Sequence, residues 1–138
     1  LVTICLMIYI STEKINLKSS SKELFKFLSD PNKMAEIISY KKTRHLKVEG
    51  ELITFIIKWA ARFNFVISKI TEDYLLIEST KDVEFSTAIR FDIRDEKTGS
   101  SIILHAETDT SPVVDFTLEK KMNTWIKAIS LNLETYFN

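Results

Sequence analysis

Histidine, cysteine and serine are the side chains of this sequence that could perform nucleophilic chemistry. The 138 residues contain two histidines, His45 and His105, and one cysteine, Cys5. Nucleophilic catalysis needs a serine or cysteine beside a histidine that a carboxylate orients, and hydrolases often present that nucleophile on a sharp glycine-containing turn. Both histidines lie in strand-like segments without such a turn, and His105 alternates with Leu104 and Ala106, which places it on a solvated strand face. The sequence therefore predicts no nucleophilic centre.

Carboxylates are the remaining candidates for acid–base chemistry. Glu78, Glu107 and Asp109 have the right functional group for proton transfer, but each alternates with apolar neighbours, as an exposed carboxylate does. One cysteine and two histidines do not form a zinc-type cluster, so no metal site is expected. Two glycines in the whole chain exclude a glycine-rich phosphate loop, and no cofactor is expected.

The stretch 41–47, Lys-Lys-Thr-Arg-His-Leu-Lys, is the densest group of positive charges. It lacks the interleaved aromatic side chains on which nucleic-acid bases stack. Over the whole chain, 19 Lys and Arg balance 19 Asp and Glu, so no net field attracts nucleic acid or an anionic membrane. Lysines also protect the edge strands of sheets from pairing with other chains. We expect the stretch to protect a sheet edge or simply to be solvated.

Length and composition predict one globular domain over residues 1–138, large enough to bury a core without disulfides. A lone Cys5 cannot form an intramolecular disulfide, which favours a cytoplasmic protein. The apolar run 1–10 would rise only about 15 Å as a helix, against a membrane core of about 30 Å, so no membrane insertion is expected. It also lacks the basic region and cleavage site of a signal peptide. Its β-branched residues indicate a first strand, with Met7 as an alternative start of the chain.

Two short helices are predicted directly after this first strand, which ends near Lys18. Residues 20–23, Ser-Ser-Lys-Glu, form a capping box, in which the serine hydroxyl accepts hydrogen bonds from amides of the first turn. Asp30 and Pro31 end this helix and begin the next. The apolar faces of the two helices are expected to consist of Leu24, Phe25, Phe27, Leu28, Met34, Ile37 and Ile38.

Residues 40–109 change to a period of two, interrupted by turn signals. The segments predicted as strands are 41–48, 51–59, 62–70, 74–80, 83–94 and 101–109. Phe63 and Phe65, for example, alternate with Asn64 and Val66, so one strand face is apolar and the other polar. Short turns and the lack of intervening helices indicate an antiparallel meander with one covered face.

The last predicted element is a long amphipathic helix. After Pro112 the apolar residues return to a period of 3.6 as far as Phe137. At about 36 Å this helix spans the whole domain, so the sheet must fold around it. The predicted fold class is α+β, with a curved antiparallel sheet of about seven strands wrapped around a long C-terminal helix and two short helices after the first strand.

This order of elements resembles the helix-grip superfamily, which includes the birch-pollen allergen, START lipid-transfer domains, polyketide cyclases and coenzyme Q-binding proteins (the SRPBCC proteins). Residues 20–34, Ser-Ser-Lys-Glu-Leu-Phe-Lys-Phe-Leu-Ser-Asp-Pro-Asn-Lys-Met, are similar to the first-helix signature of that superfamily, and residues 116–137 match its terminal helix in place and length. The resemblance covers essentially the whole chain, and its motifs are packing motifs. It implies that a hydrophobic small molecule binds between the concave sheet and the long helix.

Strand alternation and helix periodicity assign a candidate wall to that cavity. The predicted ligand-binding residues are Met34, Ile38, Phe55, Ile57, Trp59, Arg62, Phe63, Phe65, Ile67, Phe85, Thr87, Ile89, Phe91, Leu104, Met122, Trp125, Ile126 and Ile129. An almost purely apolar wall suits a fatty acid or other lipid, an isoprenoid quinone or a polyketide. The same side chains also fit a packed core without a ligand.

A carboxylate head group would need a cation, because an unpaired charge in an apolar pocket is costly. Arg62 is the first candidate, since it lies at a predicted strand tip where a pocket would open. Arg44 and His45 are further candidates, whereas Arg90 alternates to the polar face.

The leading prediction is a carrier or sensor that binds a lipid and performs no catalysis. A polyketide cyclase or dehydratase is the alternative from the enzyme class, and it would require several polar side chains that point into the pocket. A protein-interaction module of the co-chaperone type is the third possibility, and it would require an exposed apolar patch on the outer sheet face. The sequence makes no prediction about oligomeric state.

Overall fold

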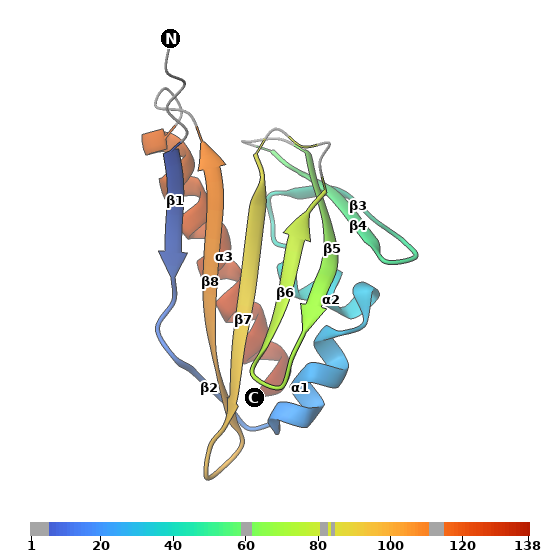
Figure 1. The fold of residues 1–138 in the computed structure, drawn as a ribbon, viewed down its shortest axis with the longest axis vertical. Helices are drawn as coiled ribbons and strands as arrows, with labels where there is room; N and C mark the ends of the chain where they lie inside the picture. Colours follow the sequence, from blue (N-terminus) through green and yellow to red (C-terminus); the bar gives the residue numbers. More distant parts are fainter. Residues whose placement is uncertain (1–5, 59–61, 81–82, 84, 111–114) are drawn as a thin grey trace.

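The computed structural model describes residues 6–58, 62–80, 83, 85–110 and 115–138 (Figure 1). It contains strands and helices in the predicted order, which confirms the α+β class. The elements are β1 (Leu6–Ser11), β2 (Ile15–Leu17), α1 (Ser21–Leu28), α2 (Pro31–Ile38), β3 (Thr43–Glu49), β4 (Leu52–Ile57), β5 (Arg62–Ile70), β6 (Tyr74–Ser79), β7 (Thr87–Asp95), β8 (Ser100–Thr110) and α3 (Asp115–Phe137).

The strands form one antiparallel sheet in the order β1-β8-β7-β6-β5-β4-β3, and β2 also pairs with β8. From β3 to β8, each strand lies beside its successor in the chain, which confirms the predicted meander. The N-terminal strand closes the sheet on the far side of β8, so β1 and β3 form its two edges. The basic stretch 41–47 therefore overlaps an edge strand, as expected.

The N-terminal strand is interrupted, whereas the sequence predicted one extended strand as far as Lys18. Between β1 and β2, the Thr12 amide donates to the Leu104 carbonyl at 3.0 Å, and the Leu104 amide donates to the Thr12 hydroxyl at 3.0 Å. A side-chain acceptor thus replaces a backbone one, and the regular ladder breaks there. In the part of the chain that the structure describes, the sheet consequently has eight strands, against the expected seven or so.

The strand predicted for residues 83–94 begins later, at Thr87. The Thr87 amide donates to the hydroxyl of Ser79 at 2.9 Å, so the backbone ladder between β6 and β7 starts only at the pair Glu78 and Ala88. Residues 83, 85 and 86 lie outside the strand.

Asn64 in β5 differs from the expectation of a solvated side chain. It is only 9% exposed, and its Oδ1 has no hydrogen-bond partner among the described residues. Its neighbours Phe63 and Phe65 are buried as predicted. Alternation distinguishes the two faces of the strand but does not reveal that the outer face is covered at this point.

The two short helices form where the local signals predict them. The Ser20 hydroxyl accepts a hydrogen bond from the Glu23 amide at 3.2 Å, and the Asp30 carboxylate accepts one from the Asn32 amide at 2.9 Å. Pro31 occupies the first position of α2. These caps satisfy amides that have no partner within the helix. Both helices bury their apolar faces in the core, with Leu24 and Leu28 from α1.

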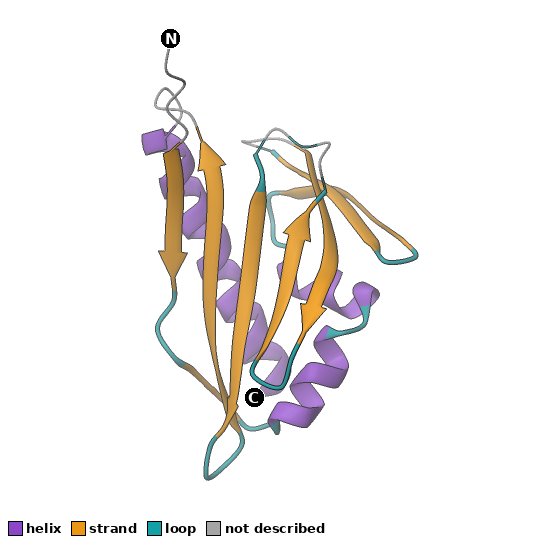
Figure 2. Cartoon of the chain, in the orientation of Figure 1, coloured by secondary structure: helices purple, strands orange, loops and turns teal. Residues whose placement is uncertain are grey.

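The long helix α3 crosses one face of the sheet diagonally and contacts β1, β2 and β8 as well as α2 (Figure 2). The inward side chains of the sheet and of the three helices form one continuous buried cluster between these layers. Among the described residues, no helix is long and apolar enough to cross a membrane.

Candidate ligand-binding interior

Nearly all of the predicted ligand-binding residues lie between the sheet and α3. Those that are buried there are Met34, Ile38, Phe55, Ile57, Phe63, Phe65, Thr87, Ile89, Phe91, Leu104, Met122, Trp125, Ile126 and Ile129. Ile67 and Phe85 are partly buried against them. Arg62 is exposed at the first position of β5, and Trp59 lies outside the described residues. The structure thus brings the apolar candidates together, while their role in ligand binding stays a prediction.

Four aromatic rings pack against one another in this interior. Phe55, Phe63 and Phe65 stack with ring centroids 5.6–6.0 Å apart. The Trp125 indole from α3 meets all three rings at 5.4–6.1 Å. These separations are typical of favourable aromatic pairs. This part of the wall is therefore in direct contact across the interior, and a ligand must lie beside the rings or displace them.

Trp125 also has a polar role that the sequence did not reveal. Its indole Nε1 donates to the carbonyl oxygen of Ile38 at 2.7 Å. About two turns further along α3, the Asn132 amide donates to the carbonyl oxygens of Ile37 and Ser39 at 2.8 and 2.7 Å. These bonds satisfy carbonyls at the C-terminal end of α2, which lack partners within their own helix. They attach α3 to α2.

The C-terminal turn of α3 adds a third attachment to α2. The Tyr136 hydroxyl donates to the Glu36 carboxylate at 2.5 Å. This hydrogen bond to a carboxylate raises the pKa of Tyr136 above its usual value. Rings of Phe27, Tyr136 and Phe137 lie 4.9–6.2 Å apart beside it. The position of α3 is thus set by polar contacts at three levels along its length.

Two buried hydroxyl groups lie next to each other in the interior. Thr87 in β7 and Thr108 in β8 are cross-strand partners, only 2% and 1% exposed, and their Oγ1 atoms lie 3.2 Å apart. The Thr87 hydroxyl donates to the Phe85 carbonyl at 3.1 Å. Thr87 was predicted to face inward, whereas Thr108 was missed, although it continues the inward alternation of Leu104 and Ala106. The buried polar residues of the described chain are Asn64, Thr87, Ser100, Ser101 and Thr108, none of which is ionisable.

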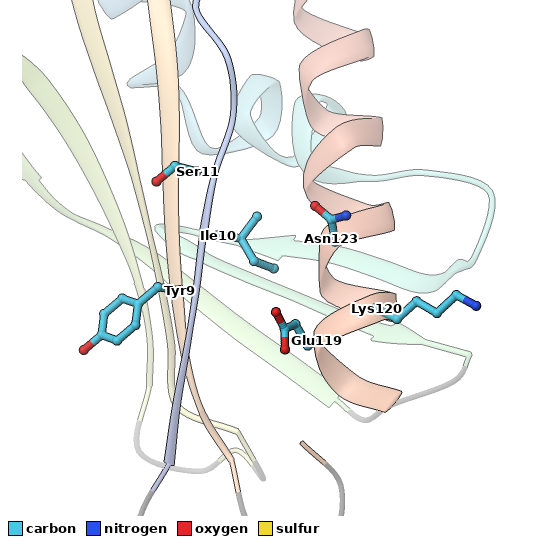
Figure 3. Close-up of a pocket in the computed structure, with 6 residues that line it drawn as sticks. All are labelled: Tyr9, Ile10, Ser11, Glu119, Lys120 and Asn123. Carbon is cyan, nitrogen blue, oxygen red and sulfur yellow. The ribbon is translucent and has the colours of Figure 1, made fainter. Parts of the chain in front are cut away.

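A surface pocket of about 530 Å³ lies at the seam between the edge strand β1 and α3 (Figure 3). Ile10 of β1, which is partly buried, packs against the core at this seam. The Glu119 side chain extends from α3 toward β1, whereas the Lys120 side chain points away from the strand (Figure 3), and Asn123 also lines the pocket. Because this pocket borders the interior at Ile10, it is a candidate opening for a ligand.

The basic residues considered as anchors for a carboxylate lie elsewhere. Arg44 donates to the carbonyl oxygens of Lys41 and Thr43 at 2.7 and 2.8 Å in the edge strand region. His45 is exposed and has a left-handed backbone, with φ of 56°. Arg90 lies on the outer sheet face, as expected, and pairs with Asp92 at 2.8 Å.

On the outer face of the sheet, three polar side chains form a row of contacts that the sequence did not predict. The Ser11 hydroxyl lies 2.9 Å from His105 Nδ1, and His105 Nε2 lies 2.9 Å from the Asp92 carboxylate. These are the residue types of a hydrolytic triad. However, Asp92 is also held by Arg90, and the ring nitrogen that faces the serine is Nδ1, whereas in the known triads it is Nε2. Sheet register brings Ser11 opposite His105, and no local signal could reveal that pairing.

In the part of the chain that the structure describes, the antiparallel sheet, the two short helices and the long helix across one face have the arrangement of the START-like helix-grip fold. No protein-family model matches the sequence, and no curated protein is significantly similar to it. Several solved structures, however, have a similar fold.

A START superfamily protein from Mycobacterium smegmatis superposes with a TM-score of 0.65 at 14% identity, over 94% of this chain and 96% of the other. Norcoclaurine synthase from Thalictrum flavum gives a TM-score of 0.70 at 11% identity, over 97% and 87% of the two chains. An uncharacterised protein from Bacillus thuringiensis gives 0.64 at 9% identity, over 94% and 98%. At these identities the likeness establishes the fold, and it confirms the helix-grip fold that the resemblance in the sequence implied.

Proposed function

We propose that the protein binds a hydrophobic small molecule, with a fatty acid or another lipid as the leading class, between the concave sheet and α3. The observation that carries this proposal is the composition of the interior. Its side chains come from both layers of the fold, they are almost all apolar, and the buried polar residues among those described carry hydroxyl or amide groups and no charge. Such a lining suits a molecule with a long apolar part and little polarity. An isoprenoid quinone or a polyketide would satisfy the same lining, and a cytoplasmic location is part of the proposal.

Access to the interior requires side chains that can repack, because the aromatic rings are in contact. Met34 from α2 and Met122 from α3 are both fully buried in this cluster. Methionine has three rotatable bonds and a polarisable sulfur, so it adapts to cavities of different shape. We propose that these side chains move to admit the ligand while the strands and the anchored α3 stay in place.

A catalytic function of the cyclase or dehydratase type is the second candidate, since the same fold is found in a synthase, norcoclaurine synthase. Such chemistry would need ionisable side chains beside the bound molecule. The buried polar groups described in this interior are hydroxyls and amides. This composition favours binding over catalysis.

A protein-interaction function has less support. The exposed large apolar side chains of the sheet are divided between Met7 and Tyr9 on the edge strand β1 and Leu46, Ile56 and Ile70 on strands β3 to β5. Three strands separate the two groups. A contiguous docking patch is therefore not formed by these residues.

Intrinsic fluorescence provides a direct test, because the chain has only two tryptophans and one of them, Trp125, is in the interior. In a Trp59→Phe variant, Trp125 is the single tryptophan. A lipid that enters the interior should change the intensity or emission maximum of Trp125 in a saturable manner. It should also raise the thermal midpoint, since a ligand that binds only the folded state stabilises it.

The ligand itself can be identified by native mass spectrometry and solvent extraction of protein purified from its own host. A co-purifying lipid of defined mass is the expected result. If extraction yields none, and neither Trp125 fluorescence nor the thermal midpoint responds to a panel of lipids and quinones, the proposed function is wrong.

A further inference from the structure

We infer that the interior selects a neutral molecule with a hydroxyl group, such as a long-chain alcohol, over the carboxylate of a fatty acid. This inference rests on the proposed function, and it specifies the chemical class of the ligand for the same site. It follows from the direction of the hydrogen bonds at Thr87 and Thr108, from the charge of the interior, and from the charge at the seam between β1 and α3.

The hydrogen bonds of the two threonines run in one direction. The Phe85 carbonyl can only accept, so the contact at 3.1 Å uses the single proton of the Thr87 hydroxyl. Both contacts can be made at the same time only if Thr108 donates its proton to Thr87 Oγ1 across the distance of 3.2 Å. In that arrangement the Thr108 proton is already donated, and Thr108 Oγ1 presents only lone pairs to a further group. A ligand group that approaches Thr108 therefore meets an acceptor and has to donate.

An ionised carboxylate cannot donate, since it carries only acceptor oxygens. An alcohol has one proton to give, and its oxygen keeps lone pairs. At this point of the interior the alcohol gains a hydrogen bond, whereas the carboxylate faces a lone pair at short range. Hydrogen bonding alone thus separates the two head groups.

Charge acts in the same direction. The buried side chains of the described residues include no lysine, arginine or histidine that could neutralise a carboxylate. The predicted anchor Arg62 is exposed, and Arg90 pairs with Asp92 on the opposite face of the sheet. Burying an ionised carboxylate without a partner is so unfavourable that the group protonates or stays in water.

The seam between β1 and α3 adds a second charge effect. Glu119 extends from α3 toward the strand, whereas Lys120 points away from it (Figure 3). A ligand that passes this seam, or whose head group stays there, meets a lining that includes Glu119 and Asn123 as well as Lys120. A hydroxyl can donate to Glu119 or Asn123, while the charges of Glu119 and Lys120 offset each other and leave no net positive charge to hold an anionic head group.

Three ligands of nearly equal size test this inference at neutral pH in the wild-type protein and, because Trp59 is itself a predicted ligand-binding residue, in parallel in the Trp59→Phe variant. These are 1-decanol, which can donate, 1-methoxynonane, which is neutral but can only accept, and decanoate, which is anionic. Binding is followed by Trp125 fluorescence. We expect 1-decanol to bind about tenfold more tightly than 1-methoxynonane, as one unmatched hydrogen bond at a buried site implies. Decanoate should bind more weakly than both.

A Thr108→Val variant is the matched control, since valine has nearly the shape of threonine without the hydroxyl. It should remove the advantage of 1-decanol over 1-methoxynonane and leave the affinity for 1-methoxynonane nearly unchanged. Thr108→Ser retains the hydroxyl and should keep the advantage, which provides a folded comparison if the valine variant is unstable.

The outcomes separate the two proposals. If decanoate binds as tightly as 1-decanol, or if Thr108→Val leaves the advantage of the alcohol intact, the inference is wrong and the proposed function stands. If none of the three ligands changes the fluorescence of Trp125 or the thermal midpoint, the proposed function itself is contradicted.

Discussion

The indole Nε1 of Trp125 lies 2.7 Å from the carbonyl oxygen of Ile38, the last residue of α2. One side chain therefore joins two helices by a hydrogen bond and also completes the aromatic cluster of the interior. Trp125 thus lines the candidate site and also anchors α3 to α2. Changes at this position should affect both the stability of the fold and the shape of the interior.

A Trp125→Phe substitution isolates the polar part of this role. Phenylalanine keeps an aromatic ring but cannot donate, so the Ile38 carbonyl loses its donor in a buried position. We expect the free energy of unfolding to fall by about 1–3 kcal/mol from the hydrogen bond, with an added loss from the smaller ring. Chemical denaturation followed by circular dichroism measures it. Leu131→Ala, at a position 63% exposed on the same helix, is the control and should change stability by less than about 0.5 kcal/mol. A Trp125→Phe protein as stable as the wild type would show that this hydrogen bond does not anchor α3.

The aromatic cluster makes a second prediction. Phe65 is fully buried and contacts Phe55, Phe63 and Trp125, so Phe65→Ala should lower the free energy of unfolding by about 3–5 kcal/mol. The cavity left behind is apolar, and benzene or toluene should recover part of the loss in thermal midpoint, as in other dry engineered cavities. Phe85→Ala is the matched change at a partly buried position and should cost less. A loss at Phe65 no larger than at Phe85 would indicate that the cluster is loosely packed and that this part of the wall already has free space.

Much of the fold could be predicted from local signals in the sequence. Ser20, Asp30 and Pro31 act within one helical turn of the positions that they cap, so the helix boundaries could be read directly. The alternation of Phe63, Phe65 and Ile89 gave the inward faces for the same reason, since it depends only on the geometry of a strand. The candidate interior followed from these two kinds of pattern.

Contacts between distant segments could not be read in this way. The hydrogen bond from Trp125 to Ile38 joins residues 87 positions apart, and that of Ser11 to His105 joins residues 94 positions apart. Both depend on how the elements are packed and registered, which a single sequence does not encode locally. The break between β1 and β2 was missed because it depends on Thr12 replacing a backbone acceptor across the sheet. Thr108 could have been predicted from the inward alternation of Leu104 and Ala106, but its hydrogen bond with Thr87 depends on the register between β7 and β8.

Two glycines allow a comparison of backbone conformation with steric contact. Gly50 and Gly99 both have left-handed backbones, with φ of 62° and 85°. An added Cβ at Gly50 meets nothing within 4 Å, whereas at Gly99 it would lie 2.0 Å from the backbone oxygen of Leu17 and 2.9 Å from that of Lys18. Gly50→Ala should therefore cost about 1–2 kcal/mol from φ alone. Gly99→Ala should lower the free energy of unfolding by about 1–3 kcal/mol more than that, because backbone atoms of β2 must move. This is the cost typical of overpacked sites. Thermal and chemical unfolding of the two variants measures the difference, and equal losses would contradict the close approach of Gly99 to β2.

Tyr136 predicts a dependence on alkaline pH. Its hydrogen bond to Glu36 raises its pKa in the folded state above the usual value of 10.0. A raised pKa means that the contact stabilises the fold below the unfolded pKa, and that this contribution is lost as the pH rises through the folded pKa. Ultraviolet absorbance of tyrosinate should show a late-titrating group that is absent in Tyr136→Phe. Glu36→Gln removes the neighbouring charge and should shift this titration to lower pH. An unchanged titration curve in Tyr136→Phe would show that the late group is another tyrosine.

His105 makes the last prediction, because it joins three strands on the outer face of the sheet. Its ring lies between Ser11 on the edge strand β1 and Asp92 on β7, at 2.9 Å from each. We expect these contacts to hold β1 in the sheet and not to catalyse a reaction. Asp92 also pairs with Arg90, and the His105 ring is reversed relative to known hydrolytic triads. His105→Ala should cost about 1 kcal/mol and increase amide hydrogen exchange in β1. Ser11→Ala should have a smaller effect of the same kind, and a fluorophosphonate probe should leave Ser11 unlabelled in the wild-type protein. Stoichiometric labelling of Ser11 that disappears in His105→Ala would instead identify these residues as a catalytic centre.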